Sequence, residues 1–478
     1  MDFRFGKETG TLSKLPGAFI IRWCARLVML TLMLSPFLVA TLRASTLLDP
    51  QPEHSSTLFG YSVAVVGDID GDGVADLAVG APFQDGDFPG APGFGPPQNV
   101  GKVFLISGRT LAVIGKLKDP EFEMVQPQKF GGQLGFSVAA AGDVNGDGVP
   151  DILVGVPHHI VLGQGGEEDV VNAGRAFVFS GNNGNVLRTL DDPIPQEGAR
   201  LGFAVAGLED VDSDGIPDLL VGAPGKDTPD VEDSQVGIAY VFSGRNGSVI
   251  RSLKFPSPGP SDAGANFGAA VANAGQHKVL IGAPRRGRAF VFNAATGALK
   301  FTIHSPITER RPSFGFAVAA GKDLSGDGTP GFAIGAPLLN NLHGVVFIFS
   351  GIDGSLQRTL RSPDSQAFAR FGASIFLSSD VTGDGRPDIL VGAPEQNARG
   401  ELKAGQVFIF RGNGSRFRAI TSTTPQAFAG FGYSVATGDF NGDGIPEPVI
   451  GVPFENADLL DPGGDVETHL QIGQIEVK

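Results

Sequence analysis

The sequence predicts an all-β fold: a seven-bladed β-propeller of four-stranded antiparallel blades. The first observation behind this prediction is composition, because the 478 residues include 70 Gly and 34 Pro, with short Val, Ile and Phe runs between turns. The second is a unit of about 62 residues that recurs seven times after residue 45. The third is that the last unit lacks a strand which the start of the chain supplies. Units arranged radially in this way close into a propeller.

The first unit shows the expected strands. FGYSVAVVGD (59–68) leads into an acidic loop, DLAVGAP (76–82) follows it, and GKVFLISG (101–108) comes after a variable insert. A fourth strand follows an SG-type turn and is clearest in the second unit, in NVLRTLDDP (185–193). Short strands joined by Gly, Asn and Asp turns are typical of antiparallel hairpins, so one unit is a four-stranded meander.

Two glycine motifs mark every unit and agree on their number. The Phe-Gly or Leu-Gly starts place glycines at Gly60, Gly135, Gly202, Gly268, Gly315, Gly372 and Gly432. The GAP or GVP ends of the second strand place glycines at Gly80, Gly155, Gly222, Gly282, Gly335, Gly392 and Gly451. Both series therefore give seven blades within residues 45–478.

The two ends of the repeat region predict how the ring closes. The seventh unit stops at GQIEVK (473–478), which corresponds to a third strand. STLLDP (45–50) precedes the first Phe-Gly as RTLDDP (188–193) precedes the third unit. We therefore expect residues 45–50 to supply the outer strand of the last blade, which removes a free sheet edge.

The loop between strands 1 and 2 carries the clearest chemical signal. In DIDGDGVAD (68–76), carboxylates stand at positions 1, 3, 5 and 9, and Gly73 at position 6 permits a sharp turn. The spacing is like the first half of an EF-hand loop. However, the closing acid comes at position 9 and the flanks are strand-like, so a helix-loop-helix is excluded. Four carboxylates this close together predict a calcium site.

Six units carry this pattern, and we expect about five to six calcium ions. The candidate ligands are Asp68, Asp70, Asp72 and Asp76; Asp143, Asn145, Asp147 and Asp151; Asp210, Asp212, Asp214 and Asp218; Asp323, Ser325 and Asp327; Asp380, Thr382, Asp384 and Asp388; and Asp439, Asn441, Asp443 and Glu447. The fifth unit has Gly331 at position 9 and lacks the closing acid. The fourth unit has a shorter turn, NAGQHKV (273–279), and we expect no metal there. Asp and Gly are also common in turns that bind no metal. Such turns do not require side-chain oxygens at alternating positions, whereas this pattern occurs in six units.

The N-terminal residues 1–44 have the features of a secretory signal peptide or signal anchor. Arg22 and Arg26 precede an apolar run from Leu27 to Leu42, which is short for a bilayer span. Cys24, the only cysteine, lies in this segment, so the repeat region has no disulfide. We expect a secreted, periplasmic or cell-surface location, with membrane attachment only through an uncleaved anchor.

Charge and motifs exclude several classes of function. The net charge of −15 argues against nucleic acid and against an acidic substrate. No nucleophile elbow, metalloprotease helix or phosphate loop occurs in a suitable context. His158 and His159 are interpreted as part of a solvated loop, and the repeated strand-3 Phe residues as core between blades.

The Phe-Gly starts, GAP ends and DxDGDGxxD loops together resemble the FG-GAP repeats of the integrin alpha-subunit N-terminal propeller. The resemblance covers nearly everything after residue 45 and implies calcium on one face, with ligand contacts on the opposite face. No inserted metal-dependent adhesion domain interrupts units 2 and 3. Three hypotheses follow: an exported calcium-binding module for a protein or glycan ligand, a carbohydrate-active lyase or hydrolase, or a purely structural surface protein. Binding is favoured over catalysis because no catalytic motif is present.

The meander topology predicts where a ligand binds. The calcium loop and the SG turn lie at one end of a blade, so the insert after GAP and the linker to the next blade lie at the other end. Long inserts occur at 83–100, 158–173, 225–236 and 454–472, in contiguous units, and loops on a rigid scaffold commonly carry recognition. Their acidic residues could hold a ligand through a bridging cation: Asp85, Asp87, Glu167, Asp169, Asp230, Glu232 and Asp233.

Overall fold

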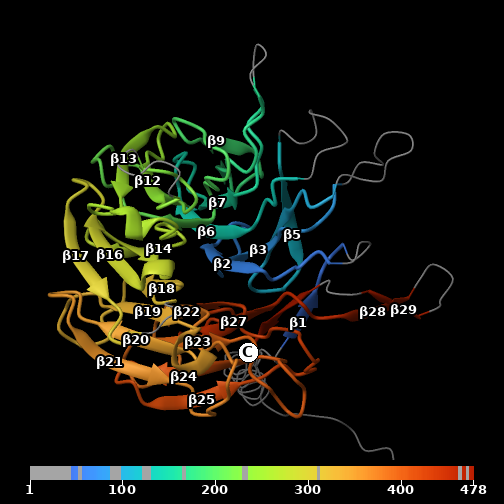
Figure 1. The fold of residues 1–478 in the computed structure, drawn as a ribbon. Coiled ribbons are helices and arrows are strands. Elements are labelled where there is room, and N and C mark those ends of the chain that lie inside the picture. The colour runs from blue at the N-terminus through green and yellow to red at the C-terminus, as the bar shows by residue number, and fades with distance from the viewer. Residues whose placement is uncertain are drawn as a thin grey trace, which may run out of the picture. The chain divides into compact units, whose positions relative to one another are not determined.

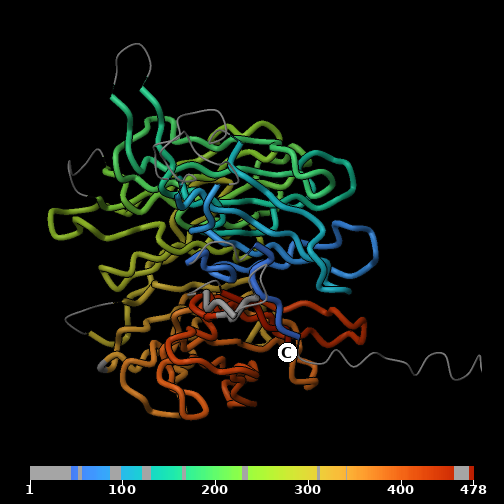
Figure 2. The backbone as a smooth tube through the Cα atoms, turned by 90° about the vertical axis from the view of Figure 1, so that its right-hand side faces the viewer, coloured from blue at the N-terminus to red at the C-terminus, as the bar shows by residue number. Residues whose placement is uncertain are grey.

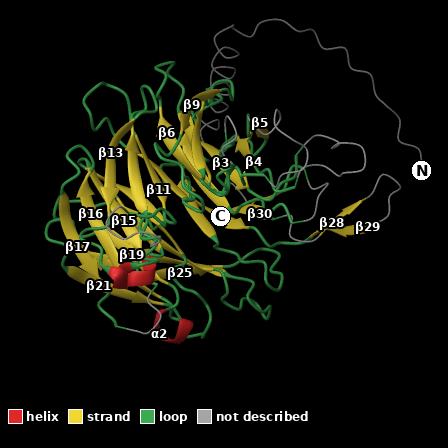
Figure 3. Ribbon diagram, turned by 45° about the horizontal axis from the view of Figure 1, so that its top comes forward, coloured by secondary structure: helices red, strands yellow, loops and turns green. Residues whose placement is uncertain are grey.

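The computed structural model describes residues 45–51, 56–86, 98–120, 131–163, 168–228, 235–308, 313–460, 466–469 and 473–478. The predicted signal segment 1–44 lies outside the described residues. Residues 42–478 form one compact unit, and the regular secondary structure of its described part is almost entirely β-strand (Figures 1 and 3). The all-β prediction is therefore confirmed.

Seven four-stranded antiparallel sheets make up the unit, as predicted. The first four blades are β2 (Ser62–Gly67), β3 (Asp76–Ala81), β4 (Lys102–Ile106) and β5 (Val113–Lys118); β6 (Ser137–Gly142), β7 (Asp151–Val156), β8 (Arg175–Phe179) and β9 (Val186–Leu190); β10 (Ala204–Gly207), β11 (Leu219–Ala223), β12 (Ile238–Phe242) and β13 (Val249–Lys254); and β14 (Ala270–Gly275), β15 (Lys278–Ala283), β16 (Arg288–Asn293) and β17 (Leu299–His304). Blades 5 and 6 are β18 (Ala317–Ala320), β19 (Phe332–Ala336), β20 (Val345–Phe349) and β21 (Leu356–Arg361); and β22 (Ser374–Ser378), β23 (Asp388–Ala393), β24 (Gln406–Arg411) and β25 (Arg416–Ile420).

Blade 7 combines the two ends of the repeat region in the order β1-β30-β27-β26. Its strands are β26 (Ser434–Gly438), β27 (Glu447–Val452), β30 (Gln474–Val477) and the N-terminal β1 (Ser45–Leu48). β1 pairs antiparallel with β30, with Leu47 opposite Ile475. Ring closure by an N-terminal strand is therefore the arrangement that the sequence predicted.

The blades follow one another in a closed cycle. Each first strand neighbours the first strand of the next blade, in the order β2, β6, β10, β14, β18, β22, β26 and back to β2. The tube view shows the blue N-terminal strands beside the red C-terminal ones where the ring closes (Figure 2).

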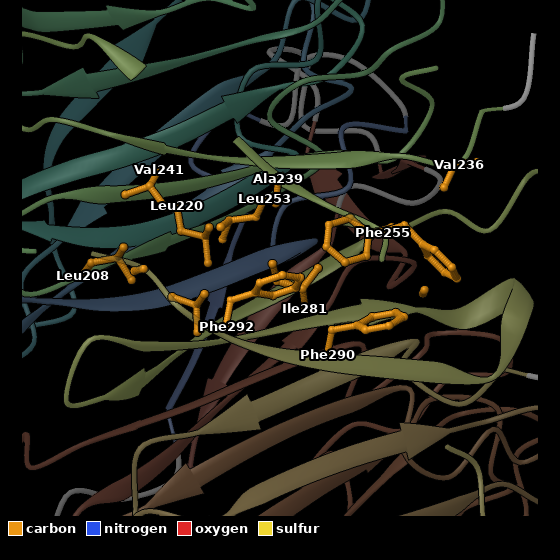
Figure 4. Close-up of a cluster of buried hydrophobic side chains, with 14 of the residues drawn as sticks. Leu208, Leu220, Val236, Ala239, Val241, Leu253, Phe255, Ile281, Phe290 and Phe292 are labelled. Carbon is orange, nitrogen blue, oxygen red and sulfur yellow. The ribbon is translucent and has the colours of Figure 1, made fainter. Parts of the chain in front are cut away.

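Apolar side chains fill the space between neighbouring blades. The middle strands are buried on both faces, as β3 and β4 are along their whole lengths, so they read as continuous apolar runs. Between blades 3 and 4, Leu220 and Val241 pack in one cluster with Phe290 and Phe292 (Figure 4). The strand-3 Phe residues are thus core, as predicted, and each blade is held by its two neighbours.

The two glycine motifs meet at every junction between blades. A Cβ atom on Gly80, in the GAP end of blade 1, would lie 2.0 Å from the carbonyl oxygen of Gly135, in the Leu-Gly start of blade 2. The same contact closes the ring, where a Cβ on Gly451 would lie 2.0 Å from the carbonyl oxygen of Gly60. Glycine is required at the GAP position because the next blade's backbone occupies the space of a side chain.

Helices are few and short among the described residues. They are η2 (Pro260–Asp262), η3 (Pro284–Arg286) and α2 (Leu339–Leu342). None of these described helices has the length and apolar character that spanning a bilayer requires. The insert of blade 7 contributes a two-stranded hairpin, β28 (Ala457–Leu460) and β29 (Val466–His469), which projects from the blade in Figures 1 and 3.

Candidate functional site

All six acidic loops join the first strand of a blade to its second, so they lie at the same end of every blade that has one. The fourth blade instead has a tight turn in which Gln276 and His277 adopt positive φ angles of 55° and 56°. The shorter connection predicted for blade 4 is therefore confirmed, while the absence of metal there stays a prediction.

Hydrogen bonds from the backbone hold the position-1 aspartate in each loop. In blade 1, Asp68 Oδ1 accepts from the N–H groups of Gly71 at 2.7 Å and Asp72 at 3.1 Å, and Oδ2 accepts from Gly73 N–H at 2.8 Å. Asp143 accepts the equivalent three bonds in blade 2, and Asp323 does so in blade 5. The loop is thus wrapped around the carboxylate at its start.

Two positions in each loop need a left-handed backbone. Gly71 at position 4 has a φ of 77° and Gly73 at position 6 has a φ of 87°. A Cβ atom added to Gly71 would have no neighbouring atom within 4 Å. Conformation, not space, therefore selects glycine here. Blade 3 departs from the pattern, because Ser213 occupies position 4 with a φ of 66°. From the sequence, only the glycine at position 6 was predicted to be required.

In four of the loops the closing acid at position 9 is the most buried of the four candidate ligands. Asp76, Asp151, Asp218 and Asp388 are each 0% exposed. Asp76 Oδ1 accepts from Gly108 N–H at 2.8 Å, which ties the loop to the turn between strands 3 and 4. Burial raises the pKa of Asp151 to about 6 and that of Asp218 to about 6. Each is a buried acid beside other carboxylates, which a nearby cation would stabilise in its ionised form.

Carboxylate oxygens converge in two of the loops. One oxygen from each of Asp68, Asp70 and Asp76 lies within 4.8 Å of the others, and the same holds for Asp210, Asp212 and Asp214. Hard oxygen donors of this kind suit a divalent cation. These acidic clusters could bind a metal. Blade 5 differs, because the N–H of Gly331 donates to the Lys322 carbonyl at 2.9 Å and no acid stands at position 9.

Side chains at or next to the strand 3–4 turn reach the position-5 aspartate in four blades. Arg109 Nε lies 3.1 Å from Asp72 Oδ2, and its Nη2 donates to the Asp72 carbonyl at 2.7 Å. Arg245 contacts Asp214 in the same way at 2.7 Å. In blade 6 the corresponding ion pair is Arg411 with Asp384 at 3.3 Å, and in blade 2 Asn182 donates to Asp147 at 3.3 Å.

The two loops with four aspartates both have such an arginine, so one carboxylate is already paired with a positive charge. These arginines were not predicted from the sequence. Their signal was a recurring arginine beside the turn glycine, as in SGR (107–109) and SGR (243–245).

The opposite ends of the first strands carry a row of aromatic rings. Tyr61, Phe136, Phe203 and Tyr433 each follow the glycine of a Phe-Gly or Leu-Gly start. Ring centroids lie 4.9 Å apart for Tyr433 and Tyr61, 5.0 Å for Tyr61 and Phe136, and 4.9 Å for Phe136 and Phe203. This aromatic row spans blades 7, 1, 2 and 3, on the insert side. The Arg200 guanidinium lies 5.6 Å from the Phe203 ring centroid at its end.

The aromatic row was not predicted from the sequence either. Its four side chains are half-buried, and the equivalent Phe316 of blade 5 is 45% exposed. An aromatic residue directly after the glycine of the Phe-Gly or Leu-Gly start was the sequence pattern that could have predicted the row. Blades 4 and 6 have Ala269 and Ala373 there, so the row does not run all the way round.

Several predicted insert residues lie outside the described part of the chain: Asp87, Glu167, Asp230, Glu232 and Asp233. Among the described ones, Asp85 accepts from Asn99 N–H at 3.0 Å and Asp169 from Gly163 N–H at 3.1 Å. The interpretation of His159 as a solvated loop residue is wrong, because it is 9% exposed and its Nδ1 lies 3.9 Å from Asp119. Burial lowers its pKa to about 4.

Comparison with known protein families agrees with the repeat boundaries. The FG-GAP repeat model matches residues 59–106, 134–179 and 201–242, and an FG-GAP-like repeat model matches residues 380–450. Each match begins at or near a blade start or an acidic loop.

Curated relatives include several integrin alpha subunits. The chain is 35% identical to mouse integrin alpha-IIb over 179 residues, which are 36% of this chain and 15% of that protein. It is 32% identical to Xenopus laevis integrin alpha-5 over 184 residues, 37% of this chain and 16% of that protein. With chicken integrin alpha-8 it shares 32% identity over 215 residues, 43% of this chain and 18% of that protein. The chain therefore matches less than a fifth of the length of these relatives.

Proposed function

Because this chain is a propeller of FG-GAP repeats similar to part of the integrin alpha subunits, we propose that it is an exported, calcium-stabilised binding module. Its ligand is a protein or a glycan, bound on the face opposite the acidic loops. The aromatic row from Tyr433 to Phe203 is the observation that carries this proposal, since aromatic side chains and arginine are the residues on which binding energy concentrates.

Calcium would be held by the oxygen side chains at positions 1, 3, 5 and 9 of the loops. The ion supplies two positive charges, which offset carboxylates that the fold forces together. Support comes from the buried position-9 acids and from the backbone bonds that shape each loop around Asp68 and its equivalents. Five loops have an acid at position 9, and blade 5 does not, so we propose about five to six ions.

Export would depend on residues 1–44, acting as a signal peptide or anchor. The composition of this segment supports the proposal, as does the absence of cysteine from the rest of the chain. The test is the N-terminal sequence and the cellular fraction of the protein made from the full chain. A cytoplasmic protein that retains Met1 would contradict export.

The ligand face can be tested by probing a glycan array and an array of extracellular proteins with the purified full chain. Phe203→Ala removes one ring of the aromatic row, and Phe316→Ala is the matched control at the same position of blade 5. Phe203→Ala should weaken any specific signal at least about tenfold, as expected for an aromatic hot spot, and the control should not. Equal signals for the two variants, with melting temperatures unchanged, would place the ligand elsewhere.

A further inference from the structure

The fourth strand of each blade forms the outer edge of its sheet, and six of these strands are positively charged. Each of the six has a single neighbour in its sheet, and β13, β17, β21 and β25 follow one another around the outside of the ring (Figure 1). None of the six contains Asp or Glu, and each carries one or two basic residues: Lys116 and Lys118; Arg188; Arg251 and Lys254; Lys300; Arg358 and Arg361; and Arg416 and Arg418. We call these residues the basic rim.

Contacts with the next blade account for the two half-buried members of the basic rim, Arg188 and Arg358. Arg188 Nε donates to the Gly244 carbonyl in the next blade at 2.9 Å. A Cβ atom on Gly414, in the blade after that of Arg358, would lie 3.1 Å from Arg358 Cδ. The other members are exposed, and among the described residues no acidic side chain forms an ion pair with four of them: Lys254, Lys300, Arg361 and Arg416. The charges of these four face solvent.

Protection of sheet edges is the simplest explanation of charge on outer strands, because charged side chains prevent an edge from pairing with another molecule. Edge protection does not explain the sign of the charge. The chain has 51 acidic and 36 basic residues, so charges that only protected edges would be acidic at least as often as basic. Arginine also outnumbers lysine on the rim, and its planar guanidinium binds oxyanions through two parallel hydrogen bonds. A uniform positive sign over six strands therefore indicates an anionic partner.

Within blades 3 to 6, few acidic residues stand beside the rim in the chain. Asp262, which follows β13, is buried and pairs with Arg288 at 3.5 Å. Exposed acids flank only β21, where Asp353 precedes the strand and Asp364 follows it. No acidic residue occurs in the turns before β17 and β25 or in the described residues directly after them, which are 294–298, 305–308, 412–415 and 421–425. The positive charge is therefore least balanced in blades 4 and 6.

From this arrangement we infer that the basic rim of blades 3 to 6 binds an acidic polysaccharide, whose sulfate or carboxylate groups recur along a flexible chain. The outer strands belong to successive blades of a closed ring, so their charges follow a convex edge. A flexible chain can follow that edge. A DNA duplex is stiff over about 150 base pairs, and a flat membrane meets only part of a convex surface, so both fit the rim less well.

The net charge of −15 conceals this separation of charge and does not exclude an anionic ligand at the rim. Exposed charges more than about 8 Å apart are largely screened at physiological salt, so distant acids oppose the contact only weakly. The rim lies on the outer strands, whereas the aromatic row lies at the ends of the first strands. The two sites are therefore separate, and each can be tested without the other.

The first test titrates a heparin oligosaccharide into the full chain with saturating calcium, followed by calorimetry at several salt concentrations. A dextran oligosaccharide of the same length is the neutral probe. Heparin should bind, its affinity should fall linearly with salt on logarithmic scales, and dextran should not bind. Absence of heparin binding at about 0.05 M salt, or equal binding of the two probes, would overturn the inference. Tighter binding of a DNA duplex, or of vesicles containing phosphatidylserine, would overturn the assignment to a polysaccharide.

The second test removes two charges from the rim. Lys300→Gln combined with Arg416→Gln changes exposed side chains only, so the melting temperature should stay unchanged. Heparin affinity should fall at least about fivefold, and its dependence on salt should become shallower by about two contacts. The matched control is Arg285→Gln combined with Arg399→Gln, which removes the same charge from exposed positions in the inserts of blades 4 and 6.

The control should keep the affinity for heparin within about twofold of the wild type, because its two arginines lie off the rim. An equal loss in both double variants would mean that net charge alone attracts heparin, and would overturn the inference. Phe203→Ala should leave heparin binding unchanged. A loss in that variant would place the polysaccharide on the aromatic row and overturn the assignment to the rim, so the two sites fail separately.

Discussion

Ring closure by the N-terminal strand can be tested with two adjacent leucines. In β1, Leu47 is half-buried and packs against the core between blades 7 and 1, while Leu48 is 38% exposed on the other face. Leu47→Ala should cost about 2 kcal/mol, the lower end for leucine truncation because the side chain is partly buried. Leu48→Ala should change stability by no more than about 0.5 kcal/mol.

The assay is denaturant unfolding of the full chain, followed by circular dichroism. A chain that begins at Asp49, and so lacks Ser45–Leu48, should lose more, about 3–5 kcal/mol, because four paired residues and the Leu47 contact are lost together. It should also promote association through the exposed edge of β30. If both leucine variants unfold like the wild type, and the truncated variant stays monomeric, the borrowed strand does not hold the ring.

Three further predictions concern the acidic loops. Arg109→Gln should raise calcium affinity in blade 1 and lower metal-free stability, because the arginine competes with the ion for Asp72; calorimetry that finds weaker calcium binding would contradict this. Ser213→Gly should raise stability by about 0.5–1 kcal/mol, because it relieves a left-handed non-glycine residue, and a fall in the unfolding midpoint would refute that cause. Burial raises the pKa of Asp151 and Asp218 to about 6, so the folded metal-free protein binds more protons than the unfolded chain between about pH 4 and 6. Metal-free stability should therefore fall as pH rises through that window while the stabilisation by calcium grows, and a calcium effect independent of pH from 4 to 7 would contradict it.

Repetition made the fold predictable from the sequence. Because the unit occurs seven times, Gly80 could be aligned with an equivalent glycine in every other unit. The close contact between Gly80 and Gly135 in the next blade is the physical reason why glycine recurs at this position. The borrowed strand was predictable because residues 45–50 and 188–193 share a pattern relative to the next start. The strand-3 Phe residues could likewise be assigned to the core from their position in each unit.

Contacts between separate segments were beyond sequence reasoning. Arg109 reaches Asp72 across 37 residues, and no local pattern says that the turn and the loop share one end at hydrogen-bonding distance. The aromatic row depends on first strands lying side by side, so Tyr61 and Tyr433 meet only when the ring is closed. The left-handed backbone at Ser213 is imposed by the loop, not by serine.

The central question for this protein is whether the six loops hold calcium and whether the fold depends on it. The decisive measurement is the melting temperature of the full chain, first made metal-free and then titrated with calcium, together with the number of ions bound at saturation. We expect a large fall in melting temperature without metal, full recovery with about five to six calcium ions, and poor recovery with magnesium, which requires stricter octahedral geometry. A melting curve unchanged between verified metal-free protein and excess calcium, with no bound ion, would contradict the account.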